Sequence, residues 1–179
     1  MSTSSWTNDA AQLAKMKILI VDDEPVNVAL LEEILVENEF TRFASVTDSK
    51  CAVDTCREFQ PDLVLLDLMM PAPDGFAILE SIRAYSGETF LPIVILTADT
   101  NDESKRRALE AGATDFLLKP FDHVEVALRI RNLLKSRLAH LLLDLQRAAL
   151  EDAVCQRTAE LRATIAQLEA RTQLLATDS

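Results

Sequence analysis

Glycine and aromatic residues are scarce in this chain of 179 residues, which has 3 Gly and 5% Phe, Trp and Tyr. An all-β fold needs many tight turns and favours aromatic residues in its strands, so this composition argues against one and favours a helix-rich fold. Hydrophobic residues make up 49% of the chain and charged residues 26%, which is sufficient for a full core. The length suits one globular domain of about 120 residues with an extension.

Paired cysteines, basic residues and long apolar runs are also lacking. The three cysteines, Cys51, Cys56 and Cys155, form no CxxC pair, which excludes the usual structural zinc site and predicts reduced thiols in a cytoplasmic protein. A formal net charge of -11 disfavours nucleic acid and anionic membrane surfaces as partners. No apolar run approaches the ~20 residues of a membrane span. The polar start MSTSSWTNDAAQ has neither the basic residues nor the apolar core of a signal peptide.

The stretch 63–71, LVLLDLMMP, surrounds one acid, Asp67, with apolar residues. A continuous Val/Leu run predicts a strand buried on both faces, as in the centre of a parallel sheet. Because a buried, unpaired carboxylate costs several kcal/mol, we expect Asp67 at the carboxyl end of this strand. An isolated Asp there can simply cap the following turn, so its neighbours at other strand ends decide between the two interpretations.

Apolar strand patterns alternate with helical patterns along the chain. Strands are predicted at 17–21, 41–46, 63–67, 91–96 and 115–118. A helix is predicted after each strand, the last beginning near Asp122 or His123, and residues 1–16 are expected to form a flexible arm or a short helix. Such alternation predicts an α/β fold with a parallel sheet and right-handed crossovers.

Polar residues suited to chemistry stand at four of these strand ends: Asp22 and Asp23, Asp67, Thr97, and Lys119. In a parallel sheet the carboxyl ends lie at one edge, where open α/β folds bind their ligands. Three carboxylates at neighbouring strand ends repel one another, and a divalent cation removes that repulsion. Oxygen ligands with room for water suit Mg²⁺. Unrelated caps could fall in these places by chance, but acids, a hydroxyl and an amine at one edge favour a site.

Four motifs resemble the receiver domain of two-component response regulators: VDDEP, LLDLMMP, ILTA and GATDFLLKPF. The resemblance extends from about residue 16 to 134 and implies a receiver domain at 17–134. It also implies a flavodoxin-like, doubly wound five-stranded sheet in the order 2-1-3-4-5. Asp67 is then expected to accept a phosphoryl group from a sensor histidine kinase or a phosphotransfer protein, with Mg²⁺ as the cofactor.

The resemblance also implies roles for individual residues. The metal ligands it implies are Asp22, Asp23, Asp67 and the backbone carbonyl of Met69. Lys119 would contribute a positive charge and Thr97 a hydroxyl donor to the phosphoryl oxygens, which is the neutralisation that phosphoryl transfer needs. Ala98 is small and leaves room for the phosphoryl group.

A switch and a control of phosphoryl lifetime follow from the same resemblance. Thr97 and Phe116 are expected to form the switch, because family members carry at the second position an aromatic ring that turns inward on phosphorylation. Ordinary core packing is the alternative for Phe116. Met69 and Asp99 stand where the family tunes phosphoryl lifetime. Since Met69 cannot orient a water molecule by hydrogen bonding, we expect slow hydrolysis.

No Pro or Gly occurs from Asp122 to Ser179, so we expect one long helix whose residues 135–179 form a coiled-coil extension. Residues spaced alternately by four and three, all but Thr172 hydrophobic, form two heptad stripes. They are Leu134, Leu138, Leu141, Leu145 and Ala148, then Leu161, Ile165, Leu168, Thr172 and Leu175. The stripes differ in phase by one residue, with a break at 151–156, and predict a parallel homodimer. A hairpin folded back on the domain is the alternative, and the lack of turn residues disfavours it.

The function expected is a signalling switch without separate substrate turnover. The segment 156–170, QRTAELRATIAQLEA, resembles linkers that precede output domains, so the alternative is the regulatory part of a larger enzyme such as a cyclic-dinucleotide phosphodiesterase or cyclase. A haloacid-dehalogenase-type phosphatase also uses a strand-end Asp and Mg²⁺, but it needs a second Asp where this chain has Met69. A scaffold with an inactive receiver would need none of the site residues.

Overall fold

A computed structural model describes residues 11–87, 89–98 and 102–177, with side chains described as far as residue 166. The chain forms two compact units, Met1–Leu138 and Ala139–Ser179. Among the residues described, no helix is long and apolar enough to cross a membrane.

The first unit contains a five-stranded parallel sheet in the order β2-β1-β3-β4-β5, which confirms the predicted fold. The strands are β1 (Ile18–Val21), β2 (Phe43–Val46), β3 (Leu63–Asp67), β4 (Ile93–Thr97) and β5 (Asp115–Leu118). Every residue of β1, β3 and β4 is buried, which is why these strands are almost continuous runs of Ile, Val and Leu. The parallel register pairs Val21 with Leu66 and Asp67 with Leu96, so the carboxyl ends of the central strands lie at one edge.

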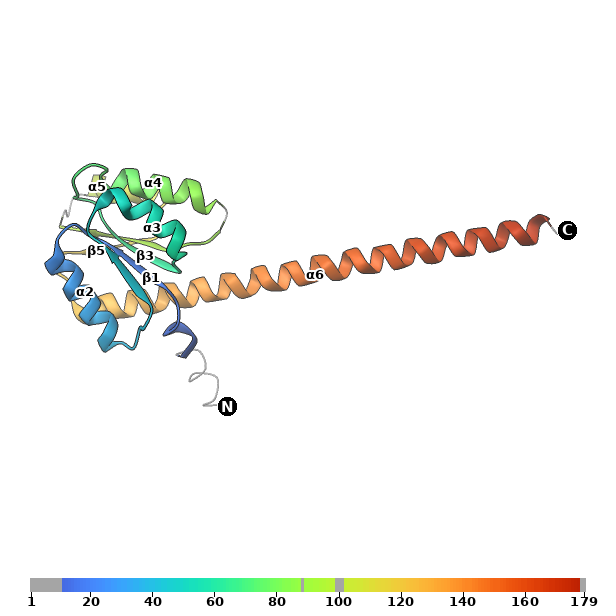
Figure 1. Ribbon diagram of the computed structural model, residues 1–179, viewed down its shortest axis with the longest axis horizontal. Coiled ribbons are helices and arrows are strands. Elements are labelled where there is room, and N and C mark those ends of the chain that lie inside the picture. The colour runs from blue at the N-terminus through green and yellow to red at the C-terminus, as the bar shows by residue number, and fades with distance from the viewer. Residues whose placement is uncertain (1–10, 88, 99–101, 178–179) are drawn as a thin grey trace. The chain divides into compact units, whose positions relative to one another are not determined.

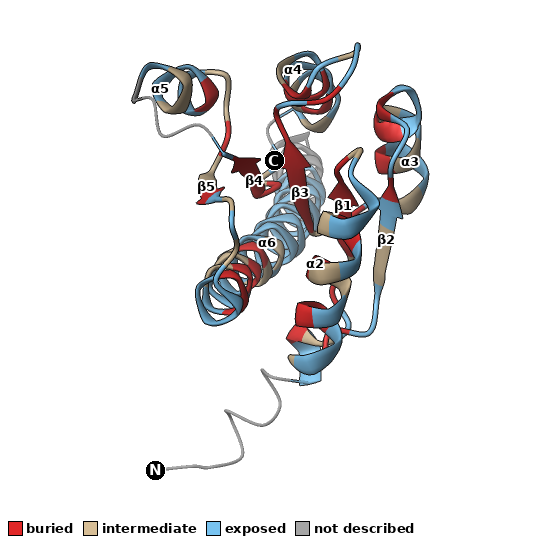
Figure 2. Cartoon of the chain, turned by 90° about the vertical axis from the view of Figure 1, so that its left-hand side faces the viewer, coloured by how far each residue is buried: buried red, intermediate tan, exposed pale blue. Residues whose placement is uncertain are grey.

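Helices cover both faces of this sheet. They are α2 (Pro25–Glu37), the short 3-10 helix η1 (Ser49–Cys51), α3 (Ala52–Phe59), α4 (Gly75–Ser86), α5 (Asp102–Glu110) and α6 (His123–Thr177). Helix α2 and the first turns of α6 lie on one face, and α3, α4 and α5 lie on the other (Figures 1 and 2). The longer helices bury apolar side chains in this unit, as with Val126 and Ile130 of α6, which are fully buried.

Residues 11–16, the part of the expected arm that the structure describes, pack against the first unit. Leu13 and Met16, three positions apart, are 4% and 6% exposed. The N–H and hydroxyl of Thr41 both donate to the carbonyl of Ala14, at 3.1 and 3.0 Å. Two apolar side chains on one face of a helical turn can be buried together, so this segment belongs to the packed unit. Residues 1–10 of the expected arm lie outside the described residues.

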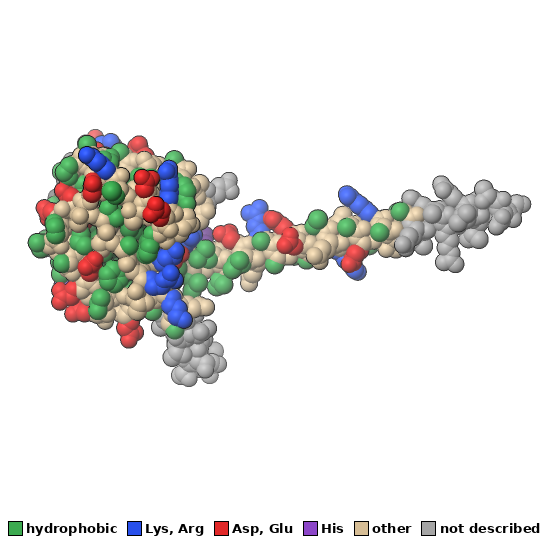
Figure 3. Space-filling view, in the orientation of Figure 1, with side chains coloured by type: hydrophobic (Ala, Val, Ile, Leu, Met, Phe, Trp, Pro, Cys, Tyr) green, Lys and Arg blue, Asp and Glu red, His purple; other side chains and the backbone are tan. Residues whose placement is uncertain are grey.

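Helix α6 is continuous from His123 to Thr177, so the alternative of a hairpin is wrong. Leu134, expected as the first residue of a heptad stripe, is fully buried in the first unit and is used by its core. In the second unit, the described side chains include large hydrophobic ones that stay exposed (Figure 3). They are Leu142, Leu143, Leu145, Leu150, Val154, Leu161 and Ile165.

Candidate functional site

Asp22, Asp23 and Asp67 meet at the carboxyl ends of β1 and β3. One carboxylate oxygen from each lies within 4.8 Å of the others. Asp22 is fully buried and Asp67 is 3% exposed, whereas Asp23 is half-buried. The two strands are direct neighbours in parallel register, so acids that follow their last apolar residues must come together.

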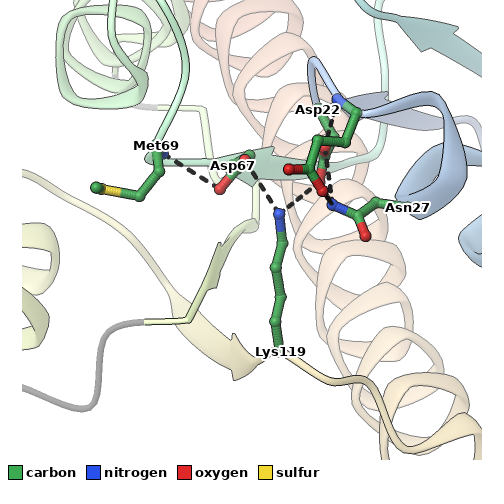
Figure 4. Close-up of polar contacts among 6 residues, drawn as sticks. Asp22, Asn27, Asp67, Met69 and Lys119 are labelled. Carbon is green, nitrogen blue, oxygen red and sulfur yellow. Dashed lines mark hydrogen bonds and ion pairs between the residues drawn. The ribbon is translucent and has the colours of Figure 1, made fainter.

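Lys119 enters the cluster from the residue after β5. Its Nζ lies 2.8 Å from Oδ2 of Asp22 and 3.0 Å from Oδ2 of Asp67 (Figure 4). The backbone N–H of Lys119 donates to the carbonyl of Thr97 at 2.8 Å, which ties the end of β5 to the end of β4. The ammonium group therefore bridges two acids that come from different strands.

Burial dominates the electrostatics of this cluster. It raises the pKa of Asp67 above the ordinary value, and the hydrogen bonds from Lys119 and from the N–H of Met69 offset this only in part. Burial on its own lowers the pKa of Lys119, but hydrogen bonds to Asp22 and Asp67 outweigh it, so the pKa is raised. With one ammonium group among three carboxylates, the cluster suits a further positive charge.

Asp22 owes its orientation to the start of α2. Its Oδ1 accepts the N–H of Glu24 at 2.9 Å, and the side-chain amide of Asn27 lies 3.1 and 3.2 Å from its two oxygens (Figure 4). The same amide donates to Oε2 of Glu24 at 2.8 Å. No role for Asn27 was predicted from the sequence. Its position in the first helical turn after the acids was the feature that could have indicated one.

The loop after β3 depends on a glycine that the sequence reading also missed. A Cβ at Gly75 would lie 2.2 Å from the carbonyl oxygen of Asp67, so only glycine fits there. The N–H of Gly75 donates to the carbonyl of Leu68 at 3.2 Å, and the N–H of Met69 donates to Oδ1 of Asp67 at 3.2 Å. Met69 is 73% exposed. Helix α4 thus begins directly against the backbone of Asp67.

The structure places Thr97 and Ala98 at this edge and Phe116 within β5. Thr97 ends β4 and is 3% exposed, and Ala98 after it is exposed. Phe116 is half-buried against the core, with Nζ of Lys105 5.1 Å from the centre of its ring. This position fits both core packing and a movable ring. Asp99 lies outside the described residues.

Comparisons with known proteins agree with this geometry. The sequence model of the response regulator receiver domain matches residues 18–131. The DNA-binding response regulator MtrA of Mycolicibacterium smegmatis is 40% identical over 117 residues, which cover 65% of this chain and 50% of MtrA. The response regulator PleD of Caulobacter vibrioides is 36% identical over 122 residues, which cover 68% of this chain and 27% of PleD. The chain therefore spans only a half or less of these two relatives.

A solved structure gives the same result. The receiver domain of the sensor histidine kinase PA1611 from Pseudomonas aeruginosa has a TM-score of 0.61 and 30% sequence identity. The match covers 68% of this chain and 98% of that domain. That structure is described as having a magnesium ion coordinated in its active-site cleft.

Proposed function

The chain belongs to the response regulator receiver family, and on this premise we propose that Asp67 accepts the phosphoryl group that switches the protein. The observation that carries the proposal is the cluster of Asp22, Asp23 and Asp67, with carboxylate oxygens within 4.8 Å and Lys119 bridging two of them. A receiver domain of a two-component system takes this group from a histidine kinase or a phosphotransfer protein, and we propose such a protein as the partner.

The residues present fit Mg²⁺. The ligands on offer are oxygen atoms, they converge from two strands, and Asp23 is exposed enough to leave room for water. Asp22, Asp23, Asp67 and the backbone carbonyl of Met69 would hold the ion. When bound, Mg²⁺ supplies positive charge to the phosphoryl oxygens and aligns them. The magnesium-containing cleft of the PA1611 receiver domain supports this assignment.

Asp67 is the nucleophile in this proposal. A carboxylate oxygen of Asp67 bonds to phosphorus, while the bond from phosphorus to the donor breaks and its electron pair stays with the donor. Lys119 is already within 3.0 Å of Asp67 and needs little movement to neutralise the transferred oxygens. The buried hydroxyl of Thr97 is a second donor at the same edge. These residues position the phosphoryl group and neutralise the charge on its oxygens, which is most of what phosphoryl transfer requires.

The switch and the lifetime of the phosphoryl group involve further residues. We propose that Thr97 moves toward the phosphoryl oxygens and that Phe116, held at half-burial, follows it inward. The thioether of Met69 cannot orient an attacking water, so hydrolysis is slow. We propose Asp99 as a second lifetime residue, by resemblance to the family.

We propose that the exposed apolar residues of the second unit pair with the same helix of another chain as a coiled coil. The spacing of Leu161 and Ile165 and their exposure, 54% and 53%, support a homodimer. The chain itself then needs no substrate turnover. An alternative output, the regulatory part of a larger cyclase or phosphodiesterase, is supported by the linker-like segment 156–170 and by the longer relative PleD, of which the match covers 27%.

Incubation with acetyl phosphate and Mg²⁺, followed by intact mass measurement, tests the phosphoacceptor. Wild type should gain one phosphoryl group, and Asp67→Asn should gain none because the nucleophilic carboxylate is gone. Asp54→Asn is the matched control, since Asp54 lies on α3 with its side chain 78% exposed, and it should behave as wild type. Equal labelling of Asp67→Asn and wild type would overturn the assignment. Continuous release of phosphate without an adduct would instead indicate a phosphatase.

A further inference from the structure

The carboxylate of Asp22 is fully buried and accepts hydrogen bonds at both of its oxygens. Its donors are the N–H of Glu24, the amide of Asn27 and the ammonium group of Lys119. A buried carboxylate that loses a donor loses stabilisation that water cannot replace. Asp22 therefore competes with Asp67 for Lys119, which lies at almost the same distance from both.

Phosphoryl transfer to Asp67, as proposed above, changes the balance of this competition. The ammonium group of Lys119 must then face new negative charge on Asp67, while Asp22 stays in its buried place. Without Lys119, the donors to Asp22 would be the N–H of Glu24 and the amide of Asn27. The N–H reaches only Oδ1, at 2.9 Å, whereas the amide lies within 3.2 Å of both oxygens.

We propose that Asn27 is a positioning residue for the reaction. It holds the carboxylate of Asp22 toward the acid cluster and keeps it hydrogen-bonded when Lys119 turns to the phosphoryl group. This inference rests on the proposed function of Asp67. It adds Asn27 to the predicted site residues. It also explains why the first turn of α2 directs a polar side chain toward Asp22.

Asn27 also fixes the side chain of Glu24 at the rim. Its amide donates to Oε2 of Glu24 at 2.8 Å, while the N–H of Glu24 donates to Asp22. The first turn of α2 thus binds the carboxylate of Asp22 through two donors, the N–H of Glu24 and the amide of Asn27, and Asn27 also binds the carboxylate of Glu24. Groups that orient metal ligands typically cost 10–100-fold in metal affinity or activity when removed, so the effect of losing Asn27 should be measurable.

Mg²⁺ binding to the unphosphorylated full chain, measured by calorimetry, tests the proposal without using activity. Asn27→Ala should bind Mg²⁺ about ten-fold more weakly than wild type, and Asn27→Ser, which keeps a shorter donor, should lie between them. Asn38→Ala is the matched control. The amide of Asn38 caps the other end of α2 by donating to the carbonyl of Ile34 at 2.9 Å, so its loss should leave Mg²⁺ affinity unchanged.

The second measurement is the initial rate of phosphorylation by acetyl phosphate at saturating Mg²⁺. Asn27→Ala should remain about ten-fold slower than wild type, because Lys119 is then held by Asp22, and Asn38→Ala should match wild type. Wild-type Mg²⁺ affinity in folded Asn27→Ala and Asn27→Ser would overturn the inference. If wild type takes up no phosphoryl group while Asn27→Ala still weakens Mg²⁺ binding, the proposed function fails and the orienting role of Asn27 stands.

Discussion

Asp22 and Asp67 are both buried, but partly different donors stabilise them. Asp22 accepts from the N–H of Glu24, the amide of Asn27 and Lys119, whereas Asp67 accepts from Lys119 and the N–H of Met69. Burial raises the pKa of Asp67 despite those two donors. The raised pKa marks a carboxylate whose negative charge is less stabilised than in water, which suits Asp67 to nucleophilic attack.

Cys56 gives a prediction about pH at the same scale. Burial raises the pKa of its thiol from 9.0 to about 11, and attraction by Arg57 offsets this only in part. The folded state therefore favours the neutral thiol more strongly than the unfolded state does. This contribution to the free energy of unfolding is fully present below pH 9 and is lost as the pH rises toward about 11. Urea unfolding across this window should therefore show a steeper fall for wild type than for Cys56→Ala.

The reactivity of the thiols provides a control for this prediction. Cys51 and Cys155 are exposed, whereas Cys56 is buried. A thiol reagent at neutral pH should modify the two exposed cysteines and reach Cys56 only on unfolding, as measured by mass spectrometry of peptides. Equal modification of all three, or identical pH slopes in the urea experiment, would contradict the burial of Cys56.

At the scale of elements, Arg83 connects α4 to the loops around β4 and β5. Its Nε donates to the carbonyl of Gly112 at 2.7 Å, and its guanidinium also donates to the carbonyl of Leu91 at 2.6 Å. Arg83→Ala should lower the free energy of unfolding by about 2 kcal/mol or more, because charge-assisted hydrogen bonds are lost and carbonyls remain unpaired. Urea unfolding measures this change.

Arg106→Ala is the matched control for Arg83→Ala. The side chain of Arg106 is 71% exposed and forms one ion pair with Glu110, at 3.8 Å, on the surface of α5. Such pairs contribute about 0–1 kcal/mol, so this variant should remain close to wild type. Similar losses in the two variants would show that Arg83 does not anchor the elements as described.

The sheet and the location of the site could be predicted from the sequence because both depend on local pattern and on parallel topology. Runs of Val, Leu and Ile predicted the strands, and β3 and β5 begin and end where expected. β4 begins two residues later than expected, at Ile93, since Pro92 has no N–H for the sheet. Parallel strands then bring their carboxyl ends to one edge, which is why Asp22, Asp67 and Lys119 were found together.

The sequence did not predict the roles of three residues, because each role depends on contacts with residues that lie elsewhere in the chain. They are Asn27, Gly75 and Arg83. Asn27 acts through the direction of its side chain in the first turn of α2, which spacing alone does not determine. Gly75 is required by the carbonyl of Asp67, eight positions earlier in the chain. Arg83 contacts Gly112, 29 positions away, and a basic residue on a helix is more often simply solvated.

At the scale of the whole molecule, the account predicts a dimer. A buried Leu or Ile contributes about 1.5–3 kcal/mol, so a second helix covering the exposed stripe would stabilise the pair substantially. Leu161→Glu with Ile165→Glu should give monomers by light scattering, because it places acids at the proposed seam. Phosphorylation of Asp67 should persist in this variant, since the substitutions lie in the second unit.

Gln156→Glu with Ala163→Glu adds two acids to the same helix as a control. In a heptad these positions face away from Leu161 and Ile165, and both are exposed. This variant should keep the oligomeric state of wild type. A monomeric wild type, or loss of the dimer in both double variants alike, would contradict pairing through the stripe.

Borohydride reduction of the phosphorylated protein tests the central claim most directly, because it converts an aspartyl phosphate to homoserine and so identifies the acceptor residue. The protein is treated with acetyl phosphate and Mg²⁺, reduced, digested, and sequenced by mass spectrometry. The account predicts homoserine at position 67, dependent on Mg²⁺ and absent without acetyl phosphate. Homoserine at Asp22 or Asp23 instead, or an unmodified peptide 63–71 from a protein that carries phosphate, would contradict it.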